Sequence, residues 1–274
     1  MKIGLIAGKS DLPIEFAKSA KAQSKDLTIF ALKSITDKKI EKYAKTYWVN
    51  FGEAQKLIDL MHKERITHFV MLGKIEHYLL IFSFFKLDKR AKEFLSKLKD
   101  KKAKTILEGV IKELEKEGFE ALDPTPYLKS LLVEKGLVNS VSLQEKYKKD
   151  VEFGIKIAKQ IAQLDIGQTV VVKDQIVIAV EGIEGTDKCI ERAGKLGGEG
   201  LVVCKSARKN QDMRYDVPVI GEKTLESMKK AKAKVLAVEA GKTYLINRGD
   251  FIKKADKLGI SVIGVNIKEN EPVI

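Results

Sequence analysis

The first half of the chain alternates short apolar runs with amphipathic stretches. Four apolar runs have the length of buried strands: residues 3–7, 27–32, 47–51 and 68–72. The stretches around them carry apolar side chains at helical spacing: residues 12–22, 53–64 and 89–116, the last of which predicts one or two helices that end at Gly118. Strands that are separated by helices favour a parallel, doubly wound sheet of the Rossmann-like type.

The second half begins with a strongly amphipathic stretch at residues 143–164, which predicts a long helix. Two β runs separated by Lys173-Asp174-Gln175 then predict a hairpin over residues 169–180. Further apolar runs predict strands: residues 201–204, 235–238, 244–246 and 262–265. Helical patterns separate these strands: residues 187–195, 224–231 and 250–258. We therefore expect a second α/β domain with a mixed sheet.

A dense proline cluster, Asp123-Pro124-Thr125-Pro126, interrupts these patterns, and the residues up to Ser140 show little periodicity. We place an N-terminal nucleotide- or substrate-binding domain at residues 1–126, a linker at 127–140 and a C-terminal catalytic domain at 141–274.

The composition is strongly basic, since 51 Lys and Arg against 38 Asp and Glu give a net charge of +13. Such a charge favours phosphates, nucleic acid or a membrane surface as partners, although many of these lysines can simply be solvated. The chain shows no basic, aromatic-interleaved RNA motif and no helix-turn-helix pattern, so we expect no nucleic-acid partner.

The two cysteines lack metal-binding or disulfide-framework spacing, which is typical of a reducing cytoplasm. The N-terminus has too short an apolar stretch for a signal peptide. The most apolar run, residues 78–85, is shorter than the roughly 20 residues that cross a bilayer. We interpret this run as core, with an apolar wall of a substrate site as the alternative.

Two turns in the first half follow the ends of predicted strands, where open parallel sheets bind ligands. Gly8 would let the backbone approach a phosphate, and Ser10 lies just before the following helix. The segment completes neither GxGxxG nor a Walker A loop, and a purely structural tight turn is about equally consistent with it. Gly73-Lys74 follows the run that ends at Leu72, and a surface turn with a solvated lysine is the alternative there.

The second half contains two further candidate segments. Thr186 and Asp187 precede a predicted helix, where they could cap it or meet a ligand. A long polar loop, residues 205–218, directly follows a predicted strand. Its cations, Lys205, Arg208 and Arg214, can neutralise phosphate oxygens, while Asp212 and Asp216 can hold a divalent cation or activate water. A solvated charged loop is the alternative.

This loop, with Gln211-Asp212-Met213-Arg214-Tyr215-Asp216-Val217-Pro218 at its centre, resembles the signature of a bacterial UDP-2,3-diacylglucosamine pyrophosphatase family. That family is the lipid A biosynthesis enzyme without the calcineurin-like metallophosphatase fold. Other segments resemble it in the same order along the chain: residues 4–8 with Leu12-Pro13, 115–119, 164–168, 184–187 and 191–194.

The resemblance implies metal-dependent hydrolysis of UDP-2,3-diacylglucosamine to UMP and 2,3-diacylglucosamine 1-phosphate (lipid X), with Mg²⁺ or Mn²⁺. Water would attack the sugar-linked phosphorus. The enzyme would be cytoplasmic and bind peripherally to the inner face of the membrane, where its nucleotide-linked lipid substrate lies. The sequence leaves open whether the chain forms a homodimer.

The resemblance also assigns roles to the candidate residues. The catalytic aspartate of the family corresponds to Asp216, for which we expect metal binding or water activation, with Asp212 as a second metal ligand. The remaining candidates are expected to bind substrate: Lys205, Gln211 and Arg214 on the pyrophosphate, and Gly8, Ser10, Gly73, Lys74, Thr186 and Asp187 around the nucleotide sugar.

Two alternatives to this activity stay open. The chain departs from the family mainly in its first half, so it could hydrolyse another nucleotide-diphosphate substrate. It could also bind a nucleotide sugar or an anionic lipid without catalysis, because Ala103-Lys104 stands where the family often has paired aspartates. A metal-independent binding that tolerates Asp216→Ala would favour the second alternative.

Overall fold

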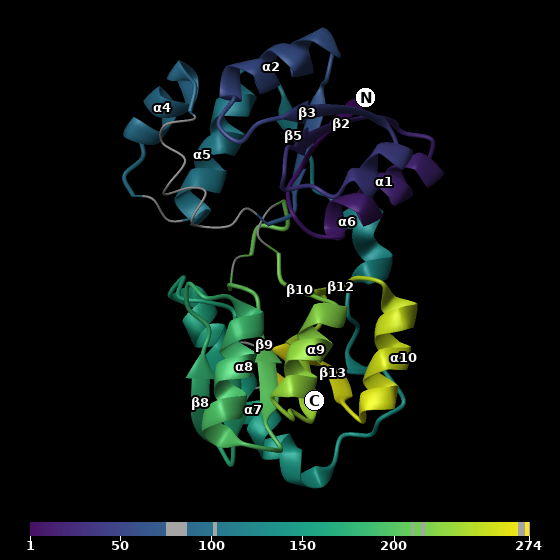
Figure 1. Cartoon of the computed structure of the whole chain (residues 1–274), viewed down its shortest axis with the longest axis vertical. Helices are drawn as coiled ribbons and strands as arrows, with labels where there is room; N and C mark the ends of the chain where they lie inside the picture. Colours follow the sequence, from purple (N-terminus) through teal and green to yellow (C-terminus); the bar gives the residue numbers. More distant parts are fainter. Residues whose placement is uncertain (75–86, 101–102, 210, 215–216, 268–271, 274) are drawn as a thin grey trace. The chain divides into compact units, whose positions relative to one another are not determined.

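The fold is described from a computed structural model, which covers residues 1–74, 87–100, 103–209, 211–214, 217–267 and 272–273. The chain divides into two compact units (Figure 1). Unit 1 comprises Met1–Lys129 together with Asp212–Asp216, and unit 2 comprises Ser130–Gln211 together with Val217–Ile274. The apolar run at residues 78–85 lies outside the described residues.

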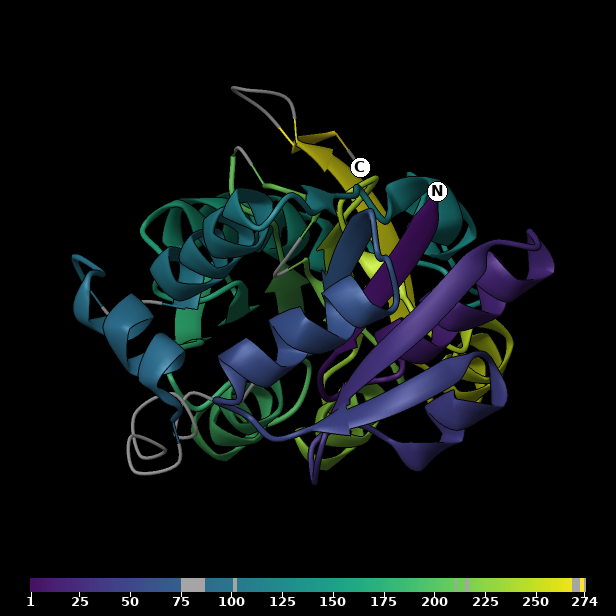
Figure 2. The same cartoon turned by 90° about the horizontal axis from the view of Figure 1, so that it is seen from above.

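Unit 1 is built on a five-stranded sheet in the order β3-β2-β1-β4-β5, in which all neighbouring strands are parallel. Its strands are β1 (Lys2–Ala7), β2 (Asp26–Leu32), β3 (Lys45–Val49), β4 (His68–Leu72) and β5 (Glu120–Ala121). In the view from above, β1, β2 and β3 run side by side (Figure 2). The predicted parallel, doubly wound sheet is therefore confirmed.

Helices of unit 1 cover this sheet: α1 (Leu12–Ala22), the 3-10 turn η1 (Lys38–Lys42), α2 (Ala54–Lys63), α4 (Lys89–Ser96), α5 (Ala103–Lys116) and α6 (Thr125–Leu128). One hydrophobic cluster joins α2 and α5 to Phe30 of β2 and Phe69 of β4. Helix α1 packs on β1 and β2 and against α6, where the rings of Phe16 and Tyr127 lie 4.9 Å apart. The charged segment at residues 89–116 contains both α4 and α5.

Unit 2 contains a mixed sheet in the order β14-β13-β11-β9-β7-β8, with β6 also paired to β13. Its strands are β6 (Gly136–Leu137), β7 (Thr169–Lys173), β8 (Ile176–Val180), β9 (Val202–Lys205), β11 (Val235–Glu239), β13 (Ser261–Ile267) and β14 (Pro272–Val273). Strands β9, β11 and β13 are parallel, whereas β7 is antiparallel to β8 and β9. Two short strands, β10 (Val219–Ile220) and β12 (Tyr244–Leu245), form a separate parallel pair. The predicted mixed sheet is confirmed.

Helices lie on both faces of the mixed sheet (Figure 1). They are α7 (Glu145–Gln163), α8 (Thr186–Gly197), α9 (Glu222–Lys230) and α10 (Arg248–Leu258), and the 3-10 turn η3 (Lys129–Leu131) precedes them. Successive side chains of β7 belong to different hydrophobic clusters. Val170 and Val172 belong to the cluster that includes α7, while Val171 belongs to the cluster that includes residues of α8, α9 and α10. Because both faces of the strand are covered, its sequence reads as a continuous apolar run.

Both cysteines are buried core residues of unit 2. Burial raises the pKa of Cys189 to about 12, and it also raises the pKa of Cys204. Cys204 lies under α7 at Gly154, where a Cβ atom would approach its Sγ to 2.5 Å. These thiols therefore act as packing groups.

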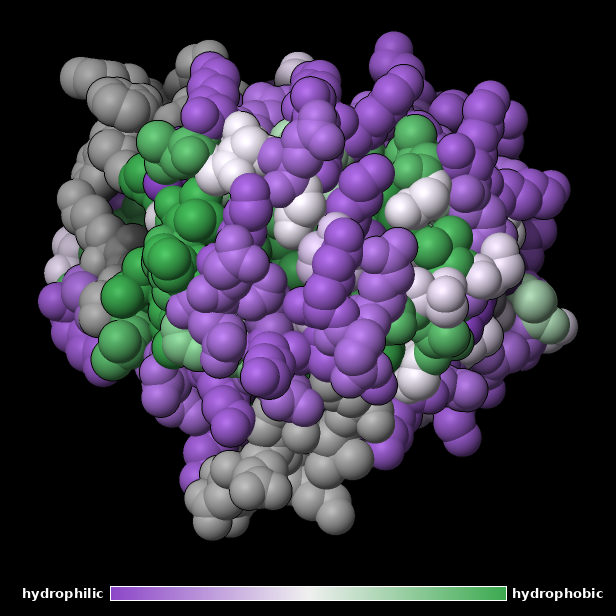
Figure 3. Space-filling model, turned by 90° about the horizontal axis from the view of Figure 1, so that it is seen from below, coloured by the Kyte–Doolittle hydropathy of each residue, from purple (hydrophilic) through white to green (hydrophobic). Residues whose placement is uncertain are grey.

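One face of the molecule carries mainly polar residues. The face seen from below is mostly hydrophilic, with hydrophobic residues gathered in separate groups (Figure 3). Among the described residues, no helix has the length and apolar content needed to cross a membrane.

Glu64, directly after α2, is the focus of the polar contacts at one end of the unit 1 sheet. Its carboxylate accepts hydrogen bonds from Lys45 Nζ at 2.8 Å, Tyr47 Oη at 2.6 Å and Lys2 Nζ at 3.4 Å. These contacts, that from Lys45 above all, lower the pKa of Glu64 to about 2. Two strands, β1 and β3, and the end of α2 thus share one carboxylate.

We expect Glu64→Gln to lower the free energy of unfolding because the amide cannot replace the charge-assisted bonds. The folded-state pKa of Glu64 lies below its ordinary value, so its stabilisation is complete above that value and is lost as the pH falls towards the folded-state pKa. The difference between variant and wild type should therefore be larger at about pH 6 than at about pH 3 in urea unfolding. Glu145→Gln, at an exposed ion pair with Lys148, serves as the control and should change little at either pH.

Candidate active site

In unit 1, the carboxyl ends of β1 and β4 lie side by side at the point where the strand order reverses. The chain runs from β1 outward through β2 to β3, then returns to place β4 on the other side of β1. Open α/β sheets bind ligands at such a switch point. Gly8 follows β1 and Gly73 follows β4, so the structure brings these two predicted residues to this position.

The backbones of Gly8 and Gly73 are in direct contact. Gly8 N donates to Leu72 O at 2.8 Å, and Lys9 and Lys74 exchange backbone hydrogen bonds of 3.0 and 2.7 Å. Gly73 has a φ of +97°, and a Cβ atom on it would lie 2.7 Å from the carbonyl carbon of Gly8. The close approach therefore excludes any side chain at Gly73.

Ser10 lies at the start of α1, where its Oγ accepts from Leu12 N at 3.4 Å. Gly8, Ser10, Gly73 and Lys74 are thus gathered at one corner of unit 1. This arrangement agrees with a tight structural turn, and their role in substrate binding stays a prediction.

In unit 2, strands β8, β9 and β11 all end at one edge of the sheet, and β7 and α8 begin there. This topology brings polar residues from five elements together: Glu181 after β8, Lys205 at the end of β9, Glu239 at the end of β11, Thr169 at the start of β7 and Thr186 at the start of α8.

Lys205 is buried and surrounded by hydroxyl groups. Its Nζ donates to Thr186 Oγ1 at 2.8 Å and lies 3.5 Å from Thr169 Oγ1. Thr186 Oγ1 in turn donates to Glu181 Oε1 at 3.0 Å. The structure therefore joins two predicted substrate-binding residues, Thr186 and Lys205, through a direct hydrogen bond.

Glu181 supplies the negative charge beside Lys205. Burial by itself would raise the pKa of this carboxyl, but the charge of Lys205 and several hydrogen bonds outweigh it and lower the pKa. These bonds come from the two threonine hydroxyls and from the N–H of Gln168, which donates to Oε2 at 3.3 Å. The sequence analysis did not identify Glu181. The feature that could have identified it in the sequence is a carboxylate directly after an apolar strand. In the fold, this strand ends at the same end of the sheet as the strand of Lys205.

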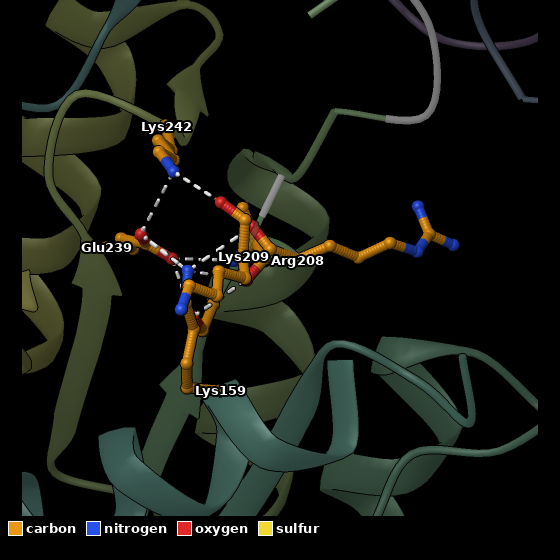
Figure 4. Close-up of polar contacts among 7 residues, drawn as sticks. Lys159, Arg208, Lys209, Glu239 and Lys242 are labelled. Carbon is orange, nitrogen blue, oxygen red and sulfur yellow. Dashed lines mark hydrogen bonds and ion pairs between the residues drawn. The ribbon is translucent and has the colours of Figure 1, made fainter. Parts of the chain in front are cut away.

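A second buried pair, Lys159 and Glu239, lies beside the start of the polar loop (Figure 4). Sequence reasoning missed both residues. Lys159 lies four residues after Ile155 and three before Ala162, on the buried face of α7. A charged residue at an apolar helical position is the signal that could have identified it.

Asp212 and Arg214, which belong to unit 1, form a tight pair. Arg214 Nε and Nη2 donate to the two carboxylate oxygens of Asp212 at 3.0 and 2.8 Å, and Arg214 N donates at 3.0 Å. Burial by itself would raise the pKa of Asp212, but these bonds lower it. Arg214 Nη1 also lies 3.8 Å from Glu115 Oε1.

Asp212 is the one proposed metal ligand that lies among the described residues. Both oxygens of Asp212 are engaged by Arg214, and the part of the chain that the structure describes contains no group of three or more His, Cys, Asp or Glu that could hold a metal ion. Asp216, the expected catalytic residue, lies outside the described residues. Asp187 is exposed in the first turn of α8. The metal and catalytic assignments stay predictions.

Two family models match the chain in succession: the LpxI N-terminal domain over residues 2–131 and the LpxI C-terminal domain over residues 134–263. The protein named UDP-2,3-diacylglucosamine pyrophosphatase LpxI from Caulobacter vibrioides is 30% identical over 280 residues, which cover 98% of this chain and 99% of that protein. A solved structure, N5-carboxyaminoimidazole ribonucleotide synthetase from Thermotoga maritima, is 15% identical over 67% of this chain and 42% of its own. Its TM-score of 0.25 is too low to support any argument.

The contact between Gly8 and Gly73 predicts how alanine substitutions will behave. Gly118 also has a positive φ, of +88°, but a Cβ atom there meets nothing within 4 Å. Gly118→Ala should therefore cost only the backbone strain, about 1–2 kcal/mol, and Gly73→Ala about 1–3 kcal/mol more because of the overlap with Gly8. Urea unfolding of both variants measures this difference, and equal losses would contradict the close approach.

Proposed function

The chain belongs to the LpxI family, and on this basis we propose that it hydrolyses the pyrophosphate bond of UDP-2,3-diacylglucosamine in lipid A biosynthesis. The observation that carries this proposal is the match of both LpxI domains in order, together with a relative of that activity that aligns over nearly its whole length. The two units and the polar edge of unit 2 are consistent with it.

The proposed reaction consumes one water molecule. Water oxygen bonds to the sugar-linked phosphorus, the bond from that phosphorus to the bridging oxygen breaks, and the bridging oxygen leaves with UMP. One proton of the water is released to solvent or to UMP, and the other product is 2,3-diacylglucosamine 1-phosphate. Negative charge increases on the departing phosphate, so fixed cations and hydrogen-bond donors at this point lower the barrier.

Lys205 fits this electrostatic role best among the described residues. Its ammonium is held by hydroxyls at the end of a parallel strand, and Thr186 beside it begins a helix whose N-terminus favours anions. We assign Lys205, Gln211 and Arg214 to the pyrophosphate. The other substrate-binding assignments are Thr186, Asp187, Gly8, Ser10, Gly73 and Lys74, as expected from the sequence.

Asp216 is proposed as the catalytic carboxylate, with Asp212 as its partner in binding Mg²⁺ or Mn²⁺. Support for the metal comes from the resemblance and from the chemistry of paired carboxylates beside a phosphate, which divalent cations favour. Since Asp212 is engaged by Arg214 in this structure, we derive no reaction step through the ion.

The acyl chains of the proposed substrate require contact with a lipid surface. The net charge of +13 supports peripheral binding to an anionic membrane, because basic residues near such a surface are attracted to it. We therefore propose that the enzyme acts at the inner face of the membrane.

Purified protein should release UMP from UDP-2,3-diacylglucosamine dispersed in mixed micelles. Asp216→Ala should reduce this release at least about 100-fold, the usual scale for losing a group that acts in the transition state. In ¹⁸O-labelled water the label should appear in the sugar phosphate, not in UMP. Asp59→Ala, at an exposed position of α2, is the matched control and should retain activity. No UMP release from the folded wild type would overturn the proposal and turn attention to other nucleotide diphosphates or to pure binding.

Removal of divalent cations tests the metal assignment separately. Release of UMP should stop after treatment with EDTA and return when Mg²⁺ or Mn²⁺ is added in excess. Undiminished turnover in EDTA would contradict the metal requirement while leaving the reaction itself in place.

A further inference from the structure

Lys159 of α7 and Glu239 of β11 form a buried ion pair whose contacts all lie around one short stretch of backbone (Figure 4). Lys159 Nζ lies 2.8 and 3.0 Å from the two carboxylate oxygens of Glu239. Only 14% of the Lys159 side chain and 6% of the Glu239 side chain are exposed. The pair therefore joins a helix to a strand across the sheet face, out of contact with most of the solvent.

The remaining hydrogen bonds of the pair go to residues 206–208, which directly follow β9. Glu239 Oε2 accepts from Ser206 Oγ at 2.6 Å and from Ala207 N at 2.9 Å. Lys159 Nζ donates to Ala207 O at 3.0 Å and to Arg208 O at 3.3 Å. The two charges thus hold both backbone polar groups of Ala207.

Neighbouring contacts extend this anchoring to both sides. Ser206 N donates to Gln168 O at 2.9 Å, and Arg208 Nε donates to Asp165 Oδ1. Lys242 Nζ donates to Lys209 O at 3.3 Å and lies 3.8 Å from Glu239 Oε1. Every residue from 206 to 209 is therefore fixed by at least one contact to another element.

A buried ion pair is an expensive way to obtain stability alone. Withdrawing two charges from water costs several kcal/mol per ion, and apolar residues of similar size often stabilise a core equally well. Burial, with the nearby Lys242 charge, lowers the pKa of Lys159 although Glu239 opposes this, so the ammonium is strongly desolvated. The burial of the two charges is explained if their function is to hold the backbone groups of residues 206–208 in place.

The stretch that they bind leads into the residues with proposed roles in the reaction. Lys205 precedes it, and Gln211, Asp212, Arg214 and Asp216 follow within eight residues of Arg208. We propose that Lys159 and Glu239 are positioning residues, which fix the direction in which this loop leaves β9 and hence the placement of Lys205 and Gln211, the two groups of unit 2 that we assign to the pyrophosphate. This inference rests on the proposed function, because it assigns the pair a part in that reaction.

Lys159→Met removes the ion pair and both bonds to the carbonyl groups, and it leaves Lys242, at 3.8 Å, as the cation beside the buried carboxylate of Glu239. A second variant, Lys159→Met with Glu239→Gln, is neutral, so it separates loop positioning from the penalty of a buried carboxylate that has lost Lys159. Its glutamine can still accept from Ser206 or Ala207. The donor to Arg208 O is lost, and Ala207 O keeps only the hydroxyl of Ser206, at 3.2 Å.

The matched control is Lys173→Met. Lys173 Nζ also donates to a backbone carbonyl of unit 2, Gly197 O at 2.9 Å, but at the opposite end of β7 from Thr169. This variant loses a lysine-to-carbonyl bond of the same kind without touching the loop at residues 206–209.

Four quantities are measured for each protein: thermal stability, hydrogen exchange of peptides covering residues 206–209, and kcat and KM for UMP release. In the neutral double variant we expect faster exchange at residues 206–209 and a kcat lower by about 10–100-fold, the effect of displacing reacting groups by about 1 Å. KM should change less than about threefold, since the loop places the reacting groups while Thr186 and α8 stay in place. Lys173→Met should change neither the exchange of this loop nor kcat.

The inference is overturned if the double variant keeps wild-type kcat, or if kcat and stability fall alike in the double variant and in Lys173→Met. If the wild type itself releases no UMP, the proposed function fails. Hydrogen exchange then decides by itself whether Lys159 and Glu239 fix the loop. Unchanged exchange at residues 206–209 in the double variant would overturn the positioning role as well.

Discussion

Lys205 and Glu239 end neighbouring parallel strands in unit 2, and both carry a charge into a buried edge of the sheet. A buried charge is tolerated only where an opposite charge and hydrogen-bond partners replace the water that it loses. Glu181 with two threonine hydroxyls satisfies Lys205, and Lys159 with Ser206 and Ala207 satisfies Glu239. The path of the chain between and after these strands is therefore set by the need to compensate both charges.

This constraint also bears on the phosphate chemistry that we propose for this edge. Groups that are held by a network before the substrate arrives need little reorganisation when charge moves in the transition state. The ammonium of Lys205 has fixed neighbours, and the loop after it is anchored through its backbone. A solvated loop of the same composition would offer equal charge but no fixed geometry.

In unit 1, backbone contacts and not charged side chains hold the candidate residues together. At its switch point, Gly8 and Gly73 approach so closely that a Cβ on Gly73 is excluded, and the surrounding contacts are backbone hydrogen bonds. The start of α1 lies beside this corner, and a helix start can attract an anion without a buried charged side chain. The candidate residues of unit 1 are thus held by backbone contacts, whereas those of unit 2 are held by charged side chains.

The sequence by itself determined the features that depend on neighbouring residues. Apolar periodicity identified β1, β2, β4 and the hairpin of β7 and β8, and the order of motifs from Gly4 to Pro218 identified the family. It also marked Lys205 and Thr186 as polar residues at a strand end and a helix start. These signals are local, because the spacing of apolar residues within a strand or helix indicates which of its faces is buried.

Only the tertiary structure decided which residues compensate one another. Lys159 and Glu239 are 80 residues apart, and no pattern within α7 or β11 specifies that pairing. The same holds for the two-residue strands β5, β6 and β10, which exist because a distant strand lies within hydrogen-bonding distance. Residue type sets what a side chain can bind, but packing of distant elements sets what lies within its reach.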